Sequence, residues 1–408
     1  MKVLIATMPF AGHIHPMQPI AQALIRRGHT VAWLTSASHE HLVRPTGATF
    51  IPSPTALARH DERVLVPDAG TSGLAAVVST LRKLFLDRIP DQVAAYQEVL
   101  STFPADVILV DLTAYGAHCF RDLTGTPYAT LGINPLVTFD PEVPPWGTGC
   151  WLLYPKLTAI LNTHRAELGL PPLPPTGFYD ATRSDVLHIM PTTPAFEFPR
   201  EFHPSIKWVG PLLPLFNEES FTSPPIWWNE MLAHPREKVV HVTQGTWATT
   251  ATNLILPTLA ALRDRSDLLV IATTPDAEKA LPVSSLPRNA RVASFVPHAK
   301  LLPHVGVIVT NAGYNGVLVA LTCGVPLVCA GRTEDKADVS SRVAWSGAGI
   351  DLGTDTPSMK AIRDAVAKVI RDEKYRKAAE IIRADFDKHD GPKEAVDALE
   401  EIIDSSQN

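Results

Sequence analysis

The chain has 408 residues, of which 45% are apolar and 19% charged, and its formal net charge is −6. This length exceeds one ordinary hydrophobic core and predicts two domains of about 200 residues each. The acidic balance argues against a nucleic-acid-binding protein, and no apolar run approaches the roughly 18 residues that a membrane-spanning helix needs. The composition is typical of a soluble globular enzyme.

Cysteine usage and the N-terminal residues indicate the compartment. The apolar run Val3–Ala6 is too short for the core of a signal peptide and is interpreted as a first β-strand. The cysteines form no C-x-x-C pair and no zinc-like spacing with histidine, so we expect them to be reduced and buried. Both features predict a cytoplasmic protein. The four cysteines are Cys119, Cys150, Cys323 and Cys329.

The first half of the chain alternates strand and helix patterns. Lys2–Thr7 is an apolar run without alternation, which is typical of a buried parallel strand. Pro16–Arg27 carries apolar residues at helical spacing, Gly28 caps it, and Thr30–Thr35 is the next strand. This is a β-α-β unit with a right-handed crossover. The pattern then recurs with a strand at Asp106–Val110, a helix at Ala114–Thr124 and a strand at Tyr128–Leu131.

A proline-dense region follows and ends the first domain. Residues 141–214 contain 14 prolines, so long helices are not expected through most of this stretch, and only Leu152–Leu168 keeps a helical pattern. We interpret the region as loops that form a pocket wall. The predicted N-terminal, acceptor-binding domain spans residues 1–208, and a linker spans residues 209–236.

The second half begins the alternation again. Val239–Thr243 is a strand, Gly245-Thr246 a turn and Asn253–Arg263 a helix, and further strands follow at Leu268–Ala272, Val292–Ser294 and Val307–Thr310. Alternating elements in both halves predict two doubly wound, Rossmann-like α/β domains, which bind ligands at the carboxyl ends of their strands. We expect the donor-binding domain at residues 237–388 and a last helix within residues 389–408.

The segment from Phe295 to Lys336 carries the clearest motif. A strand runs into the turn Asn311-Ala312-Gly313, which opens a helix, and the strand Val325–Cys329 ends at a polar run. Helix N-termini after strands present backbone N–H groups and a positive dipole end, so they bind phosphate. No G-x-G-x-x-G or G-x-x-x-x-G-K-[ST] occurs, so the dinucleotide oxidoreductase and P-loop interpretations lose their main support.

This segment resembles the donor-binding signature of the nucleotide-sugar glycosyltransferases that include the plant and macrolide enzymes. That signature reads aromatic-x-P-Q, then H-x-G-x-N-S-x-x-E, then G-V-P, then D-Q. The residues that match it are Phe295, Pro297, Gly313, Asn315, Gly324-Val325-Pro326 and Asp335. The residues that depart from it are His298 for Gln, Asn311 for His, Gly316 for Ser, Val319 for Glu and Lys336 for Gln.

The resemblance covers nearly the whole chain. It implies an inverting enzyme with the GT-B fold, in which two domains face each other across a cleft. It also implies that the last helix packs back on the N-terminal domain, as in the family. By position, the donor-binding residues it implies are Gly12, Gln244, Gly245, Thr246, Phe295, Val296, His298, Asn311, Gly313, Tyr314, Asn315, Gly316, Asp335 and Lys336.

Val319 stands where the family glutamate accepts hydrogen bonds from the ribose hydroxyls. Because valine has no acceptor, either another residue holds the ribose or the donor lacks the 2′-hydroxyl, as dTDP-sugars do. The donor is therefore expected to be a UDP- or dTDP-sugar.

A histidine and an aspartate are the predicted catalytic pair. The family's G-H-x-x-P motif puts its general base at His13, with His15 as the rival, and histidine accepts protons near neutral pH. Asp111 ends a strand at the same sheet edge and is expected to orient the imidazole. The alternatives are that the histidine caps the helix at Pro16 and that Asp111 caps the helix after it.

The acceptor is expected to be an apolar small molecule. Aromatic and aliphatic residues in the loops of the first domain are the predicted lining, although several of them could be ordinary core. They are Phe10, Phe85, Ile133, Phe139, Trp146, Trp151 and Phe178.

The expected reaction is an inverting hexosyl transfer from a nucleotide sugar, by a monomer or homodimer that binds no nucleic acid. No metal and no cofactor beyond the nucleotide-sugar co-substrate is expected, because Asp385-Phe386-Asp387 is interpreted as the solvated face of a charged helix. Two alternatives stay open: a nucleotide-sugar 2-epimerase on the same architecture, and a non-catalytic nucleotide-sugar-binding auxiliary protein.

Overall fold

The computed structural model describes residues 1–54, 73–136, 153–215, 221, 223–245, 251–275, 277–281 and 286–407. These residues form two α/β units. The first unit comprises residues 1–192, 199–215 and 390–408, and the second comprises residues 193–198 and 216–389. The stretch predicted as a linker is divided between them, with residues 209–215 in the first unit and 216–236 in the second.

Within the described residues, the first unit is built on a seven-stranded parallel sheet with the strand order β3-β2-β1-β4-β5-β6-β7. Its central strands are fully buried apolar runs, as expected for a parallel sheet covered on both faces. The strands are β1 (Lys2–Ala6), β2 (Thr30–Thr35), β3 (Thr49–Pro52), β4 (Val107–Asp111), β5 (Tyr128–Leu131), β6 (His188–Met190) and β7 (Ile206–Trp208).

Helices cover both faces of this sheet because successive strand residues point to opposite sides. Val3 and Ile5 of β1 join one hydrophobic core, and Leu4 and Ala6 join the other. The helices of this unit are α1 (Ala11–Ile14), α2 (Met17–Arg26), α3 (Glu40–Val43), α5 (Gly73–Leu84), α6 (Ile89–Thr102), α7 (Gly116–Thr124), α8 (Tyr154–Glu167), α9 (Gly177–Ala181) and α18 (Gly391–Gln407).

The second unit repeats the architecture with a six-stranded parallel sheet in the described residues, in the order β10-β9-β8-β11-β12-β13. Its strands are β8 (Val239–Thr243), β9 (Leu269–Thr273), β10 (Ala290–Ala293), β11 (Val307–Thr310), β12 (Leu327–Cys329) and β13 (Gly349–Asp351). Its helices are α10 (Trp228–Ala233), α11 (Ile255–Leu262), α12 (Ala277–Ala280), α13 (His298–Leu301), α14 (Tyr314–Thr322), α15 (Lys336–Trp345), α16 (Met359–Arg371) and α17 (Lys374–Phe386). The predicted fold class, two Rossmann-like parallel-sheet domains, is confirmed.

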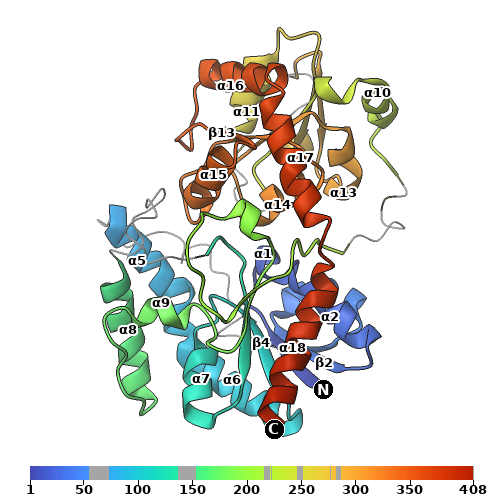
Figure 1. Cartoon of the computed structure of the whole chain (residues 1–408). Helices are drawn as coiled ribbons and strands as arrows, with labels where there is room; N and C mark the ends of the chain where they lie inside the picture. Colours follow the sequence, from blue (N-terminus) through green and yellow to red (C-terminus); the bar gives the residue numbers. More distant parts are fainter. Residues whose placement is uncertain are drawn as a thin grey trace. The chain divides into compact units, whose positions relative to one another are not determined.

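The last helix belongs to the first unit although it follows the second unit in sequence. Figure 1 shows α18 alongside α2, and the two helices pack against each other. Leu399 is fully buried in this interface. At its rim, the Arg27 guanidinium lies 2.6 Å from Asp397 and 2.8 Å from Glu400, and His29 lies 2.7 Å from Glu400.

Short elements account for most differences from the sequence expectations. β6 and β7 have three residues each and lie in the proline-dense region, where no strands were expected. The helix expected at Leu152–Leu168 is present as α8. The aspartate pair in the D-x-D lies at the end of α17, where Asp385 receives a hydrogen bond from Lys388 at 2.9 Å.

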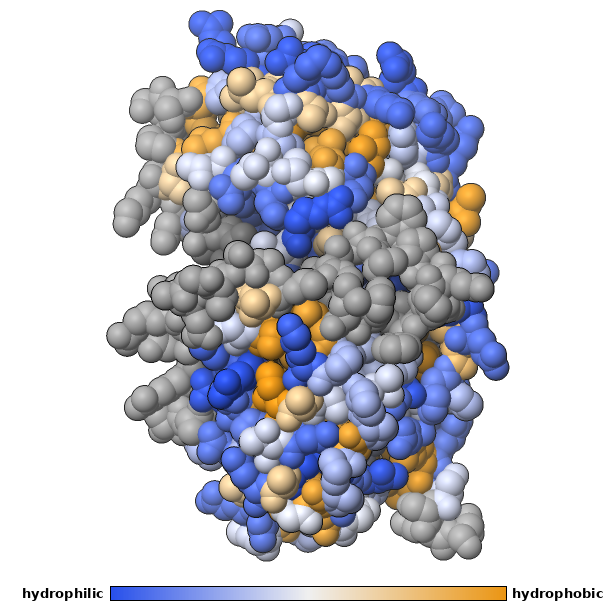
Figure 2. Space-filling view, turned by 90° about the vertical axis from the view of Figure 1, so that its left-hand side faces the viewer, coloured by the Kyte–Doolittle hydropathy of each residue, from blue (hydrophilic) through white to orange (hydrophobic). Residues whose placement is uncertain are grey.

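One face of the molecule is mainly polar, with separate apolar groups (Figure 2). On the face shown in Figure 2, hydrophilic residues surround small groups of hydrophobic ones. Among the large apolar side chains that the described residues expose are Ile226 and Phe295, the latter 76% exposed. No helix in the described ranges is long and apolar enough to cross a membrane.

We expect the Leu399→Ala variant to lose about 2–5 kcal/mol of stability, because the substitution leaves a cavity between α18 and α2. The matched control is Glu401→Ala, an exposed position on the same helix, which should change stability by less than about 0.5 kcal/mol. Urea unfolding followed by circular dichroism checks both. Equal midpoints for the two variants would contradict the burial of α18.

Candidate active site

The two predicted catalytic residues lie in contact at the carboxyl edge of the first sheet. Asp111 is the last residue of β4, and His13 lies on α1, the short helix that follows β1. Because β1 and β4 are neighbours, their carboxyl ends meet. The His13 Nδ1 atom is 3.1 Å from Asp111 Oδ1, and the His13 side chain is 14% exposed whereas Asp111 is fully buried.

The buried Asp111 carboxylate is fully hydrogen-bonded. Its Oδ2 accepts the Met8 backbone N–H at 2.8 Å. Its Oδ1 accepts the Thr113 backbone N–H at 3.0 Å and the Thr113 hydroxyl at 2.5 Å. Burial acts to raise the pKa of Asp111, but the His13 charge and these hydrogen bonds outweigh it and hold the pKa below its usual value. The carboxylate therefore stays ionised beside the imidazole.

Asp111 does not cap the helix after it, because α7 begins at Gly116 and its N-cap position is Tyr115. It instead closes the turn at Thr113, a residue that the sequence analysis did not single out. An aspartate that bonds the backbone two residues on is an Asx turn, so the D-x-T spacing was a usable signal.

Gln92 of α6 is a second residue that the sequence analysis missed. Its Nε2 donates to the Met8 sulfur at 3.1 Å, and its Oε1 accepts the Gly116 N–H at 2.7 Å. Gln92 thereby ties the loop after β1 to the start of α7, on either side of Asp111. Nothing in the local sequence marks this long-range role.

His15, the rival base, is not beside the carboxylate. Its Nδ1 lies 3.1 Å from Gln18 Oε1, and burial lowers the pKa of its imidazole. The geometry favours His13, and neither histidine occupies the N-cap position of α2, which is Pro16.

Two of the predicted acceptor residues flank the His13 ring. The Phe10 ring centroid is 4.9 Å from that of His13, and Phe85 stacks at 6.2 Å. Ile133, another predicted acceptor residue, is half-buried in the loop after β5. Gly12, which was predicted to bind the donor, is exposed on α1. Phe178 lies in the core between the rings of Tyr115 and Tyr154 and has little open surface. The remaining predicted residues, Phe139, Trp146 and Trp151, lie outside the described residues.

In the second unit, the predicted donor residues gather where three neighbouring strands end. β8 leads into Gln244 and Gly245, β11 leads into Asn311, and β12 leads to the polar run of residues 331–336, whose last residue begins α15. Gly245 has a φ of +72°, which favours glycine. Thr246 lies outside the described residues.

Asn311 joins two of these strand ends. Its Nδ2 donates to the Gln244 carbonyl at 2.7 Å, so one of its two amide N–H donors serves the fold. Gly331 approaches so closely that an added Cβ would lie 2.1 Å from the Asn311 carbonyl oxygen. Ala312 then takes a left-handed φ of 63°, and Gly313 opens α14 without any side-chain cap.

The segment predicted to bind the nucleobase has an exposed aromatic ring followed by a buried residue. Phe295 is 76% exposed while Val296 is buried. His298 starts α13, and its ring meets the buried His241 ring edge-on at 5.4 Å. Burial lowers the pKa of both imidazoles, with the charge of His298 a further cause at His241, so both rings are neutral at pH 7.

The polar run of residues 331–336 ends in a buried lysine, which is the first residue of α15. Lys336 is 6% exposed and pairs with the Glu334 carboxylate, and its Nζ also donates to Thr333 at 3.3 Å. Burial, aided by the Glu334 charge and opposed by the Lys336 charge, raises the pKa of Asp335 to about 7.

Val319, Tyr314 and the two remaining predicted residues all lie on α14. Val319 and Tyr314 pack into the core of the second unit, whereas Asn315 and Gly316 are half-buried. In the described residues no group of three His, Cys, Asp or Glu side chains could hold a metal ion.

Comparison with known proteins gives relatives over the whole chain. The family model of the erythromycin biosynthesis protein CIII-like C-terminal domain matches residues 253–402. The 4′-demethylrebeccamycin synthase of Lentzea aerocolonigenes is 36% identical over 98% of this chain and 99% of its own length. UDP-glycosyltransferase 2 of Phaeomoniella chlamydospora is 31% identical, covering 99% of this chain and 94% of the relative.

Solved structures share the fold. The glycotransferase of kitacinnamycin superposes with a TM-score of 0.79 at 19% identity, over 98% of this chain and 99% of that one. The spinosyn rhamnosyltransferase complexed with thymidine diphosphate gives a TM-score of 0.74 at 21% identity, over 98% and 100%.

The Asp111→Asn variant tests the electrostatic role of the carboxylate. A carboxylate whose pKa is lower folded than unfolded contributes stability above the unfolded pKa of about 3.9, and loses it as pH falls through the folded value. We therefore expect the stability gap between wild type and Asp111→Asn to be present at pH 7 and to narrow as the pH falls below about 5, through the unfolded pKa toward the lower folded value. Urea midpoints at several pH values measure the gap, and a gap independent of pH would refute the charged, hydrogen-bonded state.

Proposed function

Since the chain belongs to the glycosyltransferase family that includes the macrolide and other natural-product enzymes, we propose that it is an inverting transferase. It moves the sugar of a nucleoside diphosphate sugar to a hydroxyl of a largely apolar small molecule, with His13 as the general base. The observation that carries this proposal is the contact between His13 Nδ1 and the buried Asp111 carboxylate.

The contact between His13 Nδ1 and Asp111 leaves the other ring nitrogen of His13, Nε2, available to accept a proton. Asp111 accepts the Nδ1–H, which fixes the tautomer in which Nε2 is the free base. Nε2 takes the proton of the acceptor hydroxyl while that oxygen bonds to the anomeric carbon and the bond to the diphosphate breaks. The ionised Asp111 then stabilises the imidazolium. Attack opposite the leaving group converts an α-linked donor into a β-glycoside for a D-sugar.

The second unit is proposed to hold the nucleotide. The predicted contacts for the leaving diphosphate are the N-terminus of α14 at Gly313, the Asn311 amide and Thr246, without a metal ion. Phe295 offers an exposed ring for the nucleobase. Val319 favours a donor without a 2′-hydroxyl, and the thymidine diphosphate in one structural relative fits this preference.

The apolar character of the acceptor is proposed from the rings around the base. Phe10 and Phe85 pack against His13, and since Phe85 is buried, Phe10 is the half-buried ring on which a flat apolar molecule would present its hydroxyl at the imidazole. The two alternative functions gain no support, because the relatives reported above carry names of a synthase and of glycosyltransferases.

We expect His13→Ala to lower the rate of sugar transfer by about 10²–10⁴-fold, because a general base contributes that range. Nucleotide affinity, measured by calorimetry, should stay unchanged. The matched control is His15→Ala, two residues away and bonded to Gln18, which should keep the rate within about twofold. A His13→Ala enzyme that transfers at close to the wild-type rate would show that the base is another residue.

Donor choice can be tested by titrating UDP and dTDP into the protein without magnesium. We expect dTDP to bind at least about tenfold more tightly, because the apolar Val319 leaves a 2′-hydroxyl without an acceptor. Val319→Gln should narrow the difference by supplying an amide oxygen, whereas Val319→Ala, which adds no acceptor, should not. Tenfold tighter UDP binding would sink the interpretation of Val319.

A further inference from the structure

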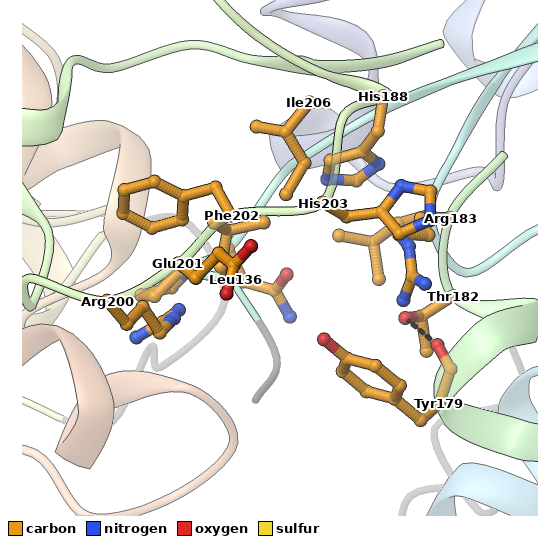
Figure 3. A pocket seen from close by; sticks show the side chains of 13 residues that line it. Leu136, Tyr179, Thr182, Arg183, His188, Arg200, Glu201, Phe202, His203 and Ile206 are labelled. Atoms are coloured by element: carbon orange, nitrogen blue, oxygen red, sulfur yellow. Dashed lines mark hydrogen bonds between the residues drawn. The ribbon is translucent and has the colours of Figure 1, made fainter. Parts of the chain in front are cut away.

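A second feature of the first unit is a cavity whose wall includes the residue that follows Asp111 in the chain. It encloses about 430 Å³ outside atoms, open solvent at its mouth included. Leu112, which directly follows Asp111, lines it together with the loop after β5, helix α9 and the segment before β7. Figure 3 shows side chains from these segments converging on one space.

An arginine without its full set of partners stands at this cavity. Arg183 is only 9% exposed, yet its Nε and Nη1 have no hydrogen-bond partner. Its Nη2 donates to Asp180 at 3.2 Å, and its guanidinium lies 4.8 Å from the centroid of the Tyr179 ring (Figure 3). Buried donors without acceptors cost free energy, so a ligand that brings an acceptor gains from this site.

An acceptor without a donor lines the same cavity. The Oδ1 atom of Asn134 is buried and has no hydrogen-bond partner. A ligand complementary to this wall must therefore offer an acceptor for Arg183 and a donor for Asn134.

The charges around the cavity balance. Two guanidinium groups, Arg183 and Arg200, stand against the carboxylates of Glu201, on the cavity wall, and Asp180, which pairs with Arg183. Burial and the Arg183 charge lower the pKa of His188 to about 3, so this ring adds no charge. A neutral group fits such a balance better than an anion, which would leave an excess negative charge in a confined space.

We propose that this cavity binds the polar end of the acceptor, and that this end is a neutral carbonyl next to an N–H or O–H, as in a lactam or amide. The carbonyl accepts from Arg183, and the adjacent donor bonds Asn134 Oδ1. The apolar side chains of Leu136, Phe202 and Ile206 surround the attached ring. This inference rests on the proposed function and refines it: the acceptor has an apolar body and one polar end.

Three bicyclic phenols of similar size test the inference. 7-Hydroxyquinolin-2-one carries a lactam, 7-hydroxycoumarin carries the carbonyl without the N–H, and 2-naphthol carries neither. We expect kcat/KM for sugar transfer to fall in that order, by about fivefold for each hydrogen bond lost.

Variants assign each bond to its residue, with transfer to 2-naphthol as the reference rate within each variant. Asn134→Leu should bring the lactam down to the level of the coumarin, and Arg183→Met should bring both carbonyl compounds toward 2-naphthol. The matched control is Arg121→Met, an arginine of the same unit with a 40% exposed side chain, which should preserve the wild-type ratios.

The outcomes separate this inference from the proposed function. Equal kcat/KM for the three phenols, or a lactam preference that survives both substitutions, overturns the inference while transfer itself stands. If none of the phenols is glycosylated, calorimetric binding of the same three compounds still decides it: lactam-selective binding that Arg183→Met removes supports the polar subsite, and equal affinities refute it.

Discussion

The need to satisfy one buried charge shapes the first unit around its candidate site. Asp111 has no exposed surface, and an unpaired carboxylate at that depth would cost far more than the fold could supply. Its oxygens take bonds from Met8, Thr113 and His13, which come from the loop after β1, the turn after β4 and α1. A single carboxylate thus fixes two loops and the imidazole, and moving the histidine would leave the charge short of a partner.

The same geometric rule places the candidate site in each unit. In the first sheet the strand order reverses between β1 and β4, and in the second between β8 and β11. At such a point the connections leave on opposite sides of the sheet and open a space at the carboxyl ends. His13 and Asp111 lie at the first reversal, and Gln244 and Asn311 at the second, where a side-chain amide joins the two strand ends.

What the sequence could predict depended on how local the signal was. Val239–Thr243 and Val307–Thr310 were predicted with their observed bounds, because a buried parallel strand is a continuous apolar run. β6 and β7 were missed because three residues among prolines leave no period to read. The pairing of His13 with Asp111 came from the resemblance, since no spacing links residues that far apart. The cavity at Arg183 and Asn134 could not be predicted, because its wall is assembled from segments that lie far apart in the sequence.

The departures from the family signature in the second unit are built into the structure. Asn311 gives up a charged donor but links the ends of β11 and β8, and Lys336 is buried against Glu334. Val319 completes an apolar core where a carboxylate would need partners. All three residues therefore take part in the packing or hydrogen bonding of the second unit, and under the proposed function Val319 leaves a ribose 2′-hydroxyl without an acceptor at this position.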